Sequence, residues 1–165
     1  MTLEGAVSPR PGSGTPVVRG KFLFVGDAKL HLRGVTYGTF SPDGSSPGFP
    51  TREQAAADLQ AMVASHINAV RVYTMPPRWL LDLALEHGIW VAVGLSWPDH
   101  VAFLDESGAG DTIVQGVREN VRALGAHPAL LCYVVGNEIP QEIVRWHGRG
   151  RVERFGRRLY EAVKR

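Results

Sequence analysis

The chain has 165 residues, of which 44% are hydrophobic and 21% are charged, and this composition fits one globular domain and excludes a disordered chain. The formal net charge of +2 is too small to argue for a nucleic-acid partner. Cys132 is the single cysteine, which excludes an intrachain disulfide framework and a thiolate zinc cluster.

The N-terminal part predicts a leader, a hairpin and a first core strand. Residues 1–16 are rich in Gly, Ser and Pro, so we expect a flexible leader there and a domain over residues 17–165. Residues 21–35 alternate apolar and polar side chains on either side of Gly26 and Asp27, which is typical of a β-hairpin. Its second arm continues into residues 33–40, a candidate core strand.

The rest of the chain alternates helices with short apolar strands. Thr51 followed by Gln54 is a capping box and predicts the start of a helix. Strands are expected at 68–74, 89–97 and 128–136, and helices at 76–88, about 111–125 and about 152–163. After the hairpin, a strand and a helix follow each other four times, which indicates a parallel sheet covered by helices.

Two architectures fit this order, an open doubly wound sheet and part of a (β/α)₈ barrel. The first strand-to-helix connection lacks the G-x-G-x-x-G spacing of a dinucleotide fold. Polar and aromatic residues gather where the strands end, as in barrel enzymes: Tyr37, Arg71, Tyr73, Trp97, His100, Asn137 and Glu138. Since a full barrel takes about 250 residues, we expect an α/β fold that is the N-terminal half of a TIM (β/α)₈ barrel.

Asn137 and Glu138 follow the fourth strand directly. A glutamate at this end of a barrel strand faces the barrel mouth, where it can act as a general acid, and the asparagine can bind a substrate hydroxyl. The alternative is a turn in which the pair caps the next helix.

The other strand-end residues also have two interpretations. Arg71 lies inside a strand, where its charge must be paired, so it either faces a carboxylate in the barrel mouth or lies at a solvated strand end. Trp97 and His100 can stack on a sugar and bind its hydroxyls, or pack an ordinary loop. Tyr37 and Tyr73 end the first two strands and serve either as packing wedges or as ligand contacts.

Several further features bear on partners. The histidines have no ligand spacing, so we expect no metal and no cofactor. The arginine-rich segment 145–158 is either a solvated helix face or a surface for an anionic partner. Since no apolar run reaches about 18 residues, we expect no membrane span. The N-terminus has no apolar stretch of the signal-peptide kind, so we expect no signal peptide in this chain, with the compartment unknown and the cytoplasm as the default.

Four stretches in order along the chain resemble one enzyme family. They are FLFVGDAKLHLRGVTYG, FPTREQAAADLQAMVASHINAVRVYTMPP, LLDLALEHGIWVAVGLSW and HPALLCYVVGNEIP. Together they resemble the N-terminal hairpin and the first four strands of the clan A glycoside hydrolase barrel, in particular the family 2 β-glycosidase type. The resemblance covers about residues 21–140.

The resemblance implies a retaining glycosidase or transglycosylase that acts on a carbohydrate substrate. Glu138 would be the general acid/base, Asn137 would bind the sugar 2-hydroxyl, and Arg71 would orient the nucleophile. The family's nucleophile is a glutamate at the end of the seventh strand, which this chain does not reach, so the resemblance implies a nucleophile outside this chain.

Three hypotheses follow. The chain is half of an enzyme, completed by a complementary half-barrel or paired as a homo-oligomer that hides its open sheet edges. Alternatively, it is a non-catalytic carbohydrate-binding module. The third alternative is a truncated or engineered half-barrel fragment that self-associates.

Overall fold

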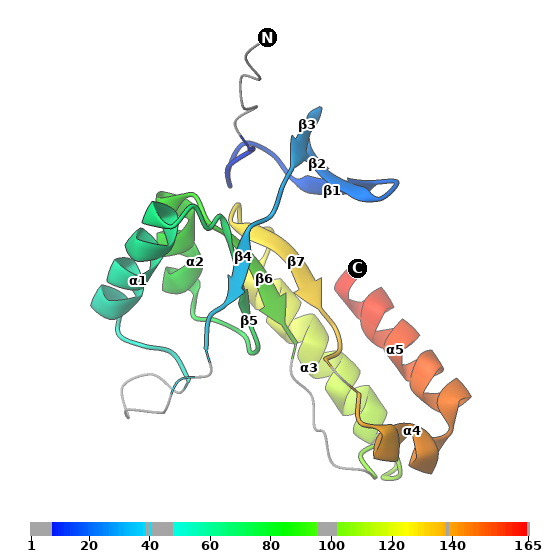
Figure 1. Cartoon of the computed structure of the whole chain (residues 1–165). Coiled ribbons are helices and arrows are strands. Elements are labelled where there is room, and N and C mark those ends of the chain that lie inside the picture. The colour runs from blue at the N-terminus through cyan, green and yellow to red at the C-terminus, as the bar shows by residue number, and fades with distance from the viewer. Residues whose placement is uncertain (1–7, 39, 41–47, 96–101, 138, 165) are drawn as a thin grey trace. The chain divides into compact units, whose positions relative to one another are not determined.

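The computed structural model of the chain describes residues 8–38, 40, 48–95, 102–137 and 139–164. The fold is α/β, with a small antiparallel sheet followed by a parallel sheet whose strands alternate with helices (Figure 1). The strands are β1 Pro16–Arg19, β2 Phe22–Val25, β3 Ala28–Leu30, β4 Gly34–Thr36, β5 Ala69–Val72, β6 Trp90–Gly94 and β7 Leu130–Val134. The helices are α1 Arg52–Ala64, α2 Arg78–His87, α3 Ala109–Leu124, α4 Gln141–His147 and α5 Arg149–Lys164.

The antiparallel sheet has the strand order β1-β2-β3 and contains the predicted hairpin. Strands β2 and β3 pair in the register Val25 to Ala28, which puts Gly26 and Asp27 in the turn and confirms the sequence prediction. Strand β1 was not predicted, and it pairs with β2 in the register Pro16 to Val25.

The second sheet has the order β4-β5-β6-β7, and β4 pairs in parallel with β5. The four strands and the helices between them confirm the predicted α/β class. Helix α1 begins where the capping box placed it, because the Thr51 side chain accepts a hydrogen bond from the Gln54 backbone N–H at 3.2 Å. Helix α2 ends at Gly88, whose φ of 73° is the left-handed conformation that favours glycine at this position.

The chain forms two compact units. The first consists of residues 1–72, 76–92 and 126–132, and the second of 73–75, 93–125 and 133–165. In the first unit, Val25 and Leu30 of the hairpin pack with Ala69 and Trp90. The Trp90 indole N–H donates to the Pro9 carbonyl at 3.2 Å, so the described part of the expected leader contacts this unit.

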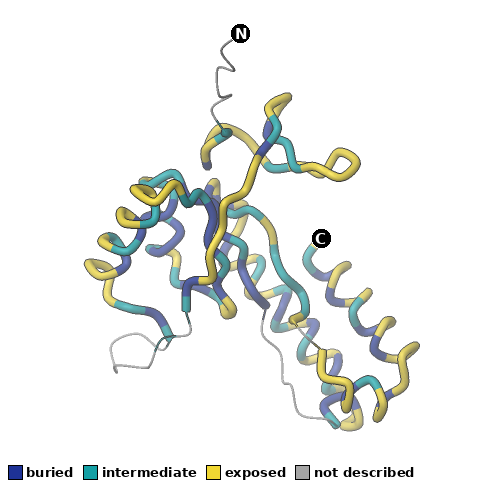
Figure 2. Tube along the Cα trace, in the orientation of Figure 1, coloured by how far each residue is buried: buried dark blue, intermediate teal, exposed yellow. Residues whose placement is uncertain are grey.

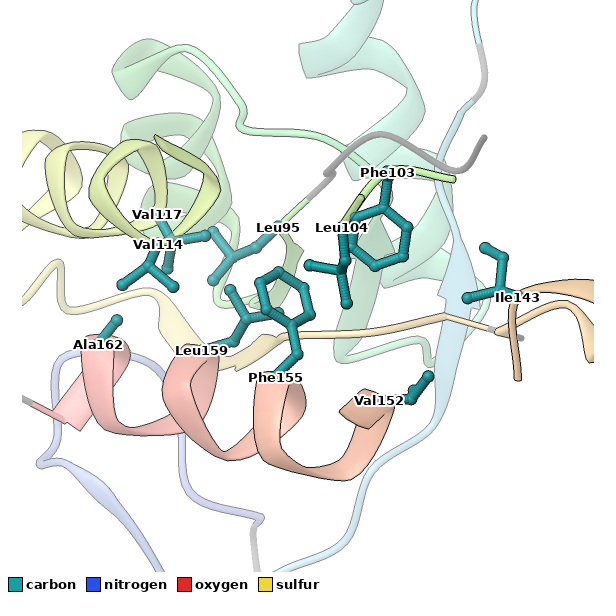
Figure 3. Packing of buried hydrophobic residues seen from close by; sticks show 10 residues of the cluster. All are labelled: Leu95, Phe103, Leu104, Val114, Val117, Ile143, Val152, Phe155, Leu159 and Ala162. Carbon is teal, nitrogen blue, oxygen red and sulfur yellow. The ribbon is translucent and has the colours of Figure 1, made fainter. Parts of the chain in front are cut away.

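The core of the second unit lies between α3 and α5 and the ends of β6 and β7 (Figure 3). It is formed by Leu95, Phe103, Leu104, Val114, Val117, Ile143, Val152, Phe155, Leu159 and Ala162. The buried residues of α5 recur at helical spacing, so one face of the helix is buried and the other is exposed (Figure 2).

The sequence predicts one helix after β7, and the structure has two. Helix α4 follows Pro140 and ends at His147. The next residue, Gly148, has a φ of 76°, and the chain changes direction there before α5 begins. Helix α4 was missed because it is short and buries only Ile143 and His147, which leaves no clear apolar period in the sequence.

Candidate functional site

Arg71 lies in β5 of the first unit, between the buried Val70 and Val72. The residue is half-buried, its Nε atom is buried, and its carbonyl accepts a hydrogen bond from the Tyr37 backbone N–H at 2.8 Å. The positive charge of its guanidinium influences the pKa of the Cys132 thiol in β7. Burial of the sulfur raises the pKa of the Cys132 thiol, although the residue as a whole is exposed, and the Arg71 charge opposes that shift.

Tyr37 directly follows β4 in the same unit, and its side chain bonds to α1. The residue is 6% exposed, and its hydroxyl donates to the Asp58 carboxylate at 2.8 Å. Burial and then the bond and charge of Asp58 raise the pKa of the Tyr37 hydroxyl far above its ordinary value. Tyr37 therefore fixes the end of β4 to the helix.

Tyr73 follows β5 and belongs to the second unit. It is 38% exposed, and its backbone lies against Gly94 at the end of β6. A Cβ atom at Gly94 would lie 2.3 Å from the Tyr73 carbonyl oxygen, so only glycine permits this approach.

Asn137 follows β7 in the second unit and is exposed. The Leu95 backbone N–H donates to the Val134 carbonyl at 3.0 Å, so β6 and β7 remain paired to their carboxyl ends. The close approach at Gly94 and this bond bring Tyr73, the end of β6 and the end of β7 together within the second unit, and Asn137 follows β7 after Val135 and Gly136. None of Arg71, Tyr73 and Asn137 lacks an interaction partner.

Three predicted site residues, Trp97, His100 and Glu138, lie outside the described residues. The structure therefore describes the predicted set in two parts, with Tyr37 and Arg71 in the first unit and Tyr73 and Asn137 in the second.

A polar cluster in the second unit was not predicted. Asp105 accepts hydrogen bonds from the Trp146 indole N–H at 2.5 Å and from Arg151 at 3.1 Å, and His147 Nδ1 lies 3.4 Å from it. The Trp146 bond, and then the charges of His147 and Arg151, hold the pKa of Asp105 below its ordinary value despite an opposing effect of burial. No sequence signal links these residues, because Asp105 and Trp146 are 41 positions apart.

An open groove of about 500 Å³ lies beside this cluster. Its lining includes Asp105 and Arg151 together with residues of the α3 N-terminus and of α5: Leu104, Glu106, Ser107, Gly108, Gly110, Asp111, Arg154, Phe155 and Arg158.

The described residues offer neither a metal site nor a membrane-spanning helix. No group of three or more His, Cys, Asp or Glu residues there could hold a metal ion. No helix in that part of the chain is long and apolar enough to cross a membrane.

The known proteins that are similar to this chain are glycoside hydrolases. No protein-family profile matches the chain. The β-mannosidase A of Emericella nidulans is 33% identical over 92 residues, which is 54% of this chain and 10% of that protein. An exo-chitosanase of Amycolatopsis orientalis matches 91% of this chain and 17% of its own, with a TM-score of 0.63 and 18% identity.

A family 5 glycoside hydrolase of Bacteroides vulgatus matches 95% of this chain and 39% of its own, with a TM-score of 0.66 and 14% identity. The chain thus has the fold of a part of these enzymes, including those of the family 2 type, as its sequence resemblance implies. It spans only a small part of each of them.

Proposed function

We propose that the chain is the N-terminal half of a (β/α)₈ barrel that acts in retaining hydrolysis or transglycosylation of a β-linked sugar. The observation that carries the proposal is the position of Asn137. It is exposed three residues after the last residue of β7, whose carboxyl end stays paired with β6, and barrel enzymes hold their chemistry at this edge of a parallel sheet. Glu138 is the next residue.

The proposal gives each strand-end residue a role. Glu138 is the general acid/base, Asn137 binds the sugar 2-hydroxyl, and Arg71 orients the nucleophile. Tyr73, Trp97 and His100 contact the sugar. We leave Tyr37 out of the sugar contacts, because its hydroxyl is bonded to Asp58.

Retention of configuration needs a second carboxyl group about 5–5.5 Å from the first. We assign this nucleophile to no residue of the chain and propose that it comes from outside these 165 residues. The similar β-mannosidase and exo-chitosanase make aryl β-mannosides and aryl β-glucosaminides the first substrates to test.

Azide can take the place of the missing nucleophile in an assay. It attacks the anomeric carbon of a phenyl β-glycoside, the bond from that carbon to the phenolic oxygen breaks, and Glu138 gives its proton to the departing phenolate. The products are an α-glycosyl azide and phenol. Because phenolate leaves poorly without a proton, we expect azide-dependent phenol release from the wild-type chain and none from Glu138→Gln.

Two controls make this test specific. Dinitrophenolate is a good leaving group that departs without a proton. With a dinitrophenyl glycoside and azide, Glu138→Gln should therefore still release dinitrophenolate. Glu142→Gln changes an exposed acid in the first turn of α4 and should behave as wild type. Phenol release that is the same in wild type and Glu138→Gln would refute the role of Glu138.

The second candidate is a non-catalytic carbohydrate-binding module. The 38% exposure of Tyr73 favours it, because a partly exposed aromatic residue can contact a sugar without any chemistry. Sugar binding without Glu138-dependent release in azide would establish the module and exclude the enzyme.

A further inference from the structure

Trp146 on α4 combines high exposure with a fixed orientation. It is 62% exposed, yet its indole N–H donates to the Asp105 carboxylate at 2.5 Å. The apolar surface of an exposed tryptophan does not stabilise the fold, because it is not buried. Water usually accepts the hydrogen bond of its N–H group. Here the N–H is used inside the protein, and the ring is left open to solvent.

Asp105 holds the ring in place through further bonds. Its carboxylate accepts a hydrogen bond from Arg151 at 3.1 Å, and the same guanidinium donates to the Leu104 carbonyl at 2.5 Å. The loop before α3, helix α4 and the first turn of α5 are therefore joined through one carboxylate. A ring that is fixed before a ligand arrives loses little conformational freedom on binding.

Trp146 is not itself a lining residue of the open groove described above, but its indole N–H is bonded to Asp105, which lines that groove. The volume of about 500 Å³ lies in the range of small-molecule sites. Leu104 and Phe155 give the groove a buried apolar part, and charged side chains give it polar edges.

The charges along the groove are balanced. The lining holds three arginines, Arg151, Arg154 and Arg158, and three acids, Asp105, Glu106 and Asp111. Their formal charges cancel, so the groove has no net attraction for a polyanion such as a nucleic acid. It offers many hydrogen-bond donors and acceptors to a neutral ligand, among them Arg154, which has no ion pair within the described part of the chain.

We infer that the Trp146 ring and the groove beside it form a carbohydrate-binding platform for a neutral β-linked oligosaccharide. The apolar C–H face of a pyranose ring suits the exposed indole face, and its hydroxyls suit the guanidinium and carboxylate groups of the groove. The ligand class rests on the proposed function, whereas the platform uses none of the residues to which that function assigns chemistry.

The surroundings of the ring favour a sugar over a partner protein. The other exposed residues of α4 include Gln141, Glu142 and Arg145, so the indole is a single aromatic face among polar side chains. Protein interfaces use larger contiguous apolar patches, and one fixed ring beside a polar groove is too small for such an interface.

Binding of β-1,4-linked mannotetraose, cellotetraose and N-acetylchitotetraose to the full chain tests the platform. Calorimetry gives the affinity, and the NMR signal of the Trp146 indole N–H, assigned with Trp146→Phe, reports contact at this ring. We expect at least one sugar to move that signal, Trp146→Ala to lose about 10-fold in affinity, and Trp146→Phe to retain most of it. Tyr160→Ala removes another exposed aromatic ring, on α5, and should bind as wild type.

The outcomes separate the platform from the proposed function. If Trp146→Ala binds as tightly as wild type and the indole signal does not move, the platform is wrong, and the azide assay still decides the role of Glu138. If none of the three sugars binds, the platform is equally wrong. If the signal moves but phenol release does not depend on Glu138, the platform stands and the enzyme does not. A variant counts only when its circular dichroism spectrum matches that of the wild type.

Discussion

Gly94 is the residue that allows the end of β5 to lie close to the end of β6. A Cβ atom there would lie 2.3 Å from the Tyr73 carbonyl oxygen and 2.7 Å from its carbonyl carbon, and backbone atoms cannot move aside as a flexible side chain can. We therefore expect Gly94→Ala to lower the free energy of unfolding by about 2–3 kcal/mol, measured by urea denaturation. Gly116→Ala is the matched control, because nothing lies within 4 Å of its Cβ position in α3.

Gly116→Ala should raise the free energy of unfolding. Alanine is a better helix former than glycine, so Gly116→Ala should gain up to about 1 kcal/mol. Equal stability of Gly94→Ala and wild type would mean that the strand ends are not held this closely in solution.

Asp105 gives a prediction on pH. Its pKa in the folded chain lies below the ordinary value of 3.8, chiefly because the Trp146 indole bonds to the carboxylate. A carboxyl group of this kind stabilises the folded state fully above 3.8, and the stabilisation is lost as the pH falls through the folded-state pKa. Wild type should therefore be more stable than Asp105→Asn at pH 7, and the difference should disappear under acid conditions.

Urea denaturation at a series of pH values measures that difference. Glu106→Gln is the neighbouring control, because Glu106 has no ion pair within the described residues, so this variant should unfold at nearly the same urea concentration as wild type at pH 7. The difference in the free energy of unfolding between wild type and Asp105→Asn could persist unchanged at pH values below the ordinary pKa of an aspartate. That result would show that the negative charge of Asp105 does not stabilise the cluster.

Among the secondary-structure elements, those with local signals were predictable from the sequence and those without them were not. Thr51 and Gln54 mark the start of α1, and Gly88 marks the end of α2, because caps act over only a few residues. Strand β1 and helix α4 escaped prediction. The Val17 and Val18 side chains of β1 are both exposed, so no alternation shows, and α4 spans only 7 residues.

In the candidate site, too, local sequence patterns could be predicted and contacts between distant residues could not. The order of elements predicts polar residues near the carboxyl ends of parallel strands, and the structure has Arg71 within β5, Tyr73 directly after it and Asn137 three residues after β7. The bond of Tyr37 to Asp58 and the bond of Trp146 to Asp105 could not be predicted, because each depends on tertiary packing between residues 21 and 41 positions apart.

At the scale of the whole molecule, β4 is the feature that invites association. It is the first strand in the order of the parallel sheet, and Gly34, Val35 and Thr36 are all exposed. An exposed edge strand presents unpaired backbone N–H and carbonyl groups to any other strand, and it carries no lysine or proline that would block pairing. The half-barrel that we propose would cover this edge with a second copy or with a complementary half.

Light scattering after size exclusion tests this expectation. We expect the molar mass of the purified chain to rise with concentration above the 18.0 kDa of one copy, because a second copy can pair along β4. Val35→Lys places a charge on this edge and should keep the chain at the mass of one copy. Val18→Lys, at an exposed position of β1, is the matched control and should still associate if β4 is the edge in use. A mass of one copy for wild type at every concentration would contradict pairing along β4 and leave a complementary half-barrel as the partner to seek.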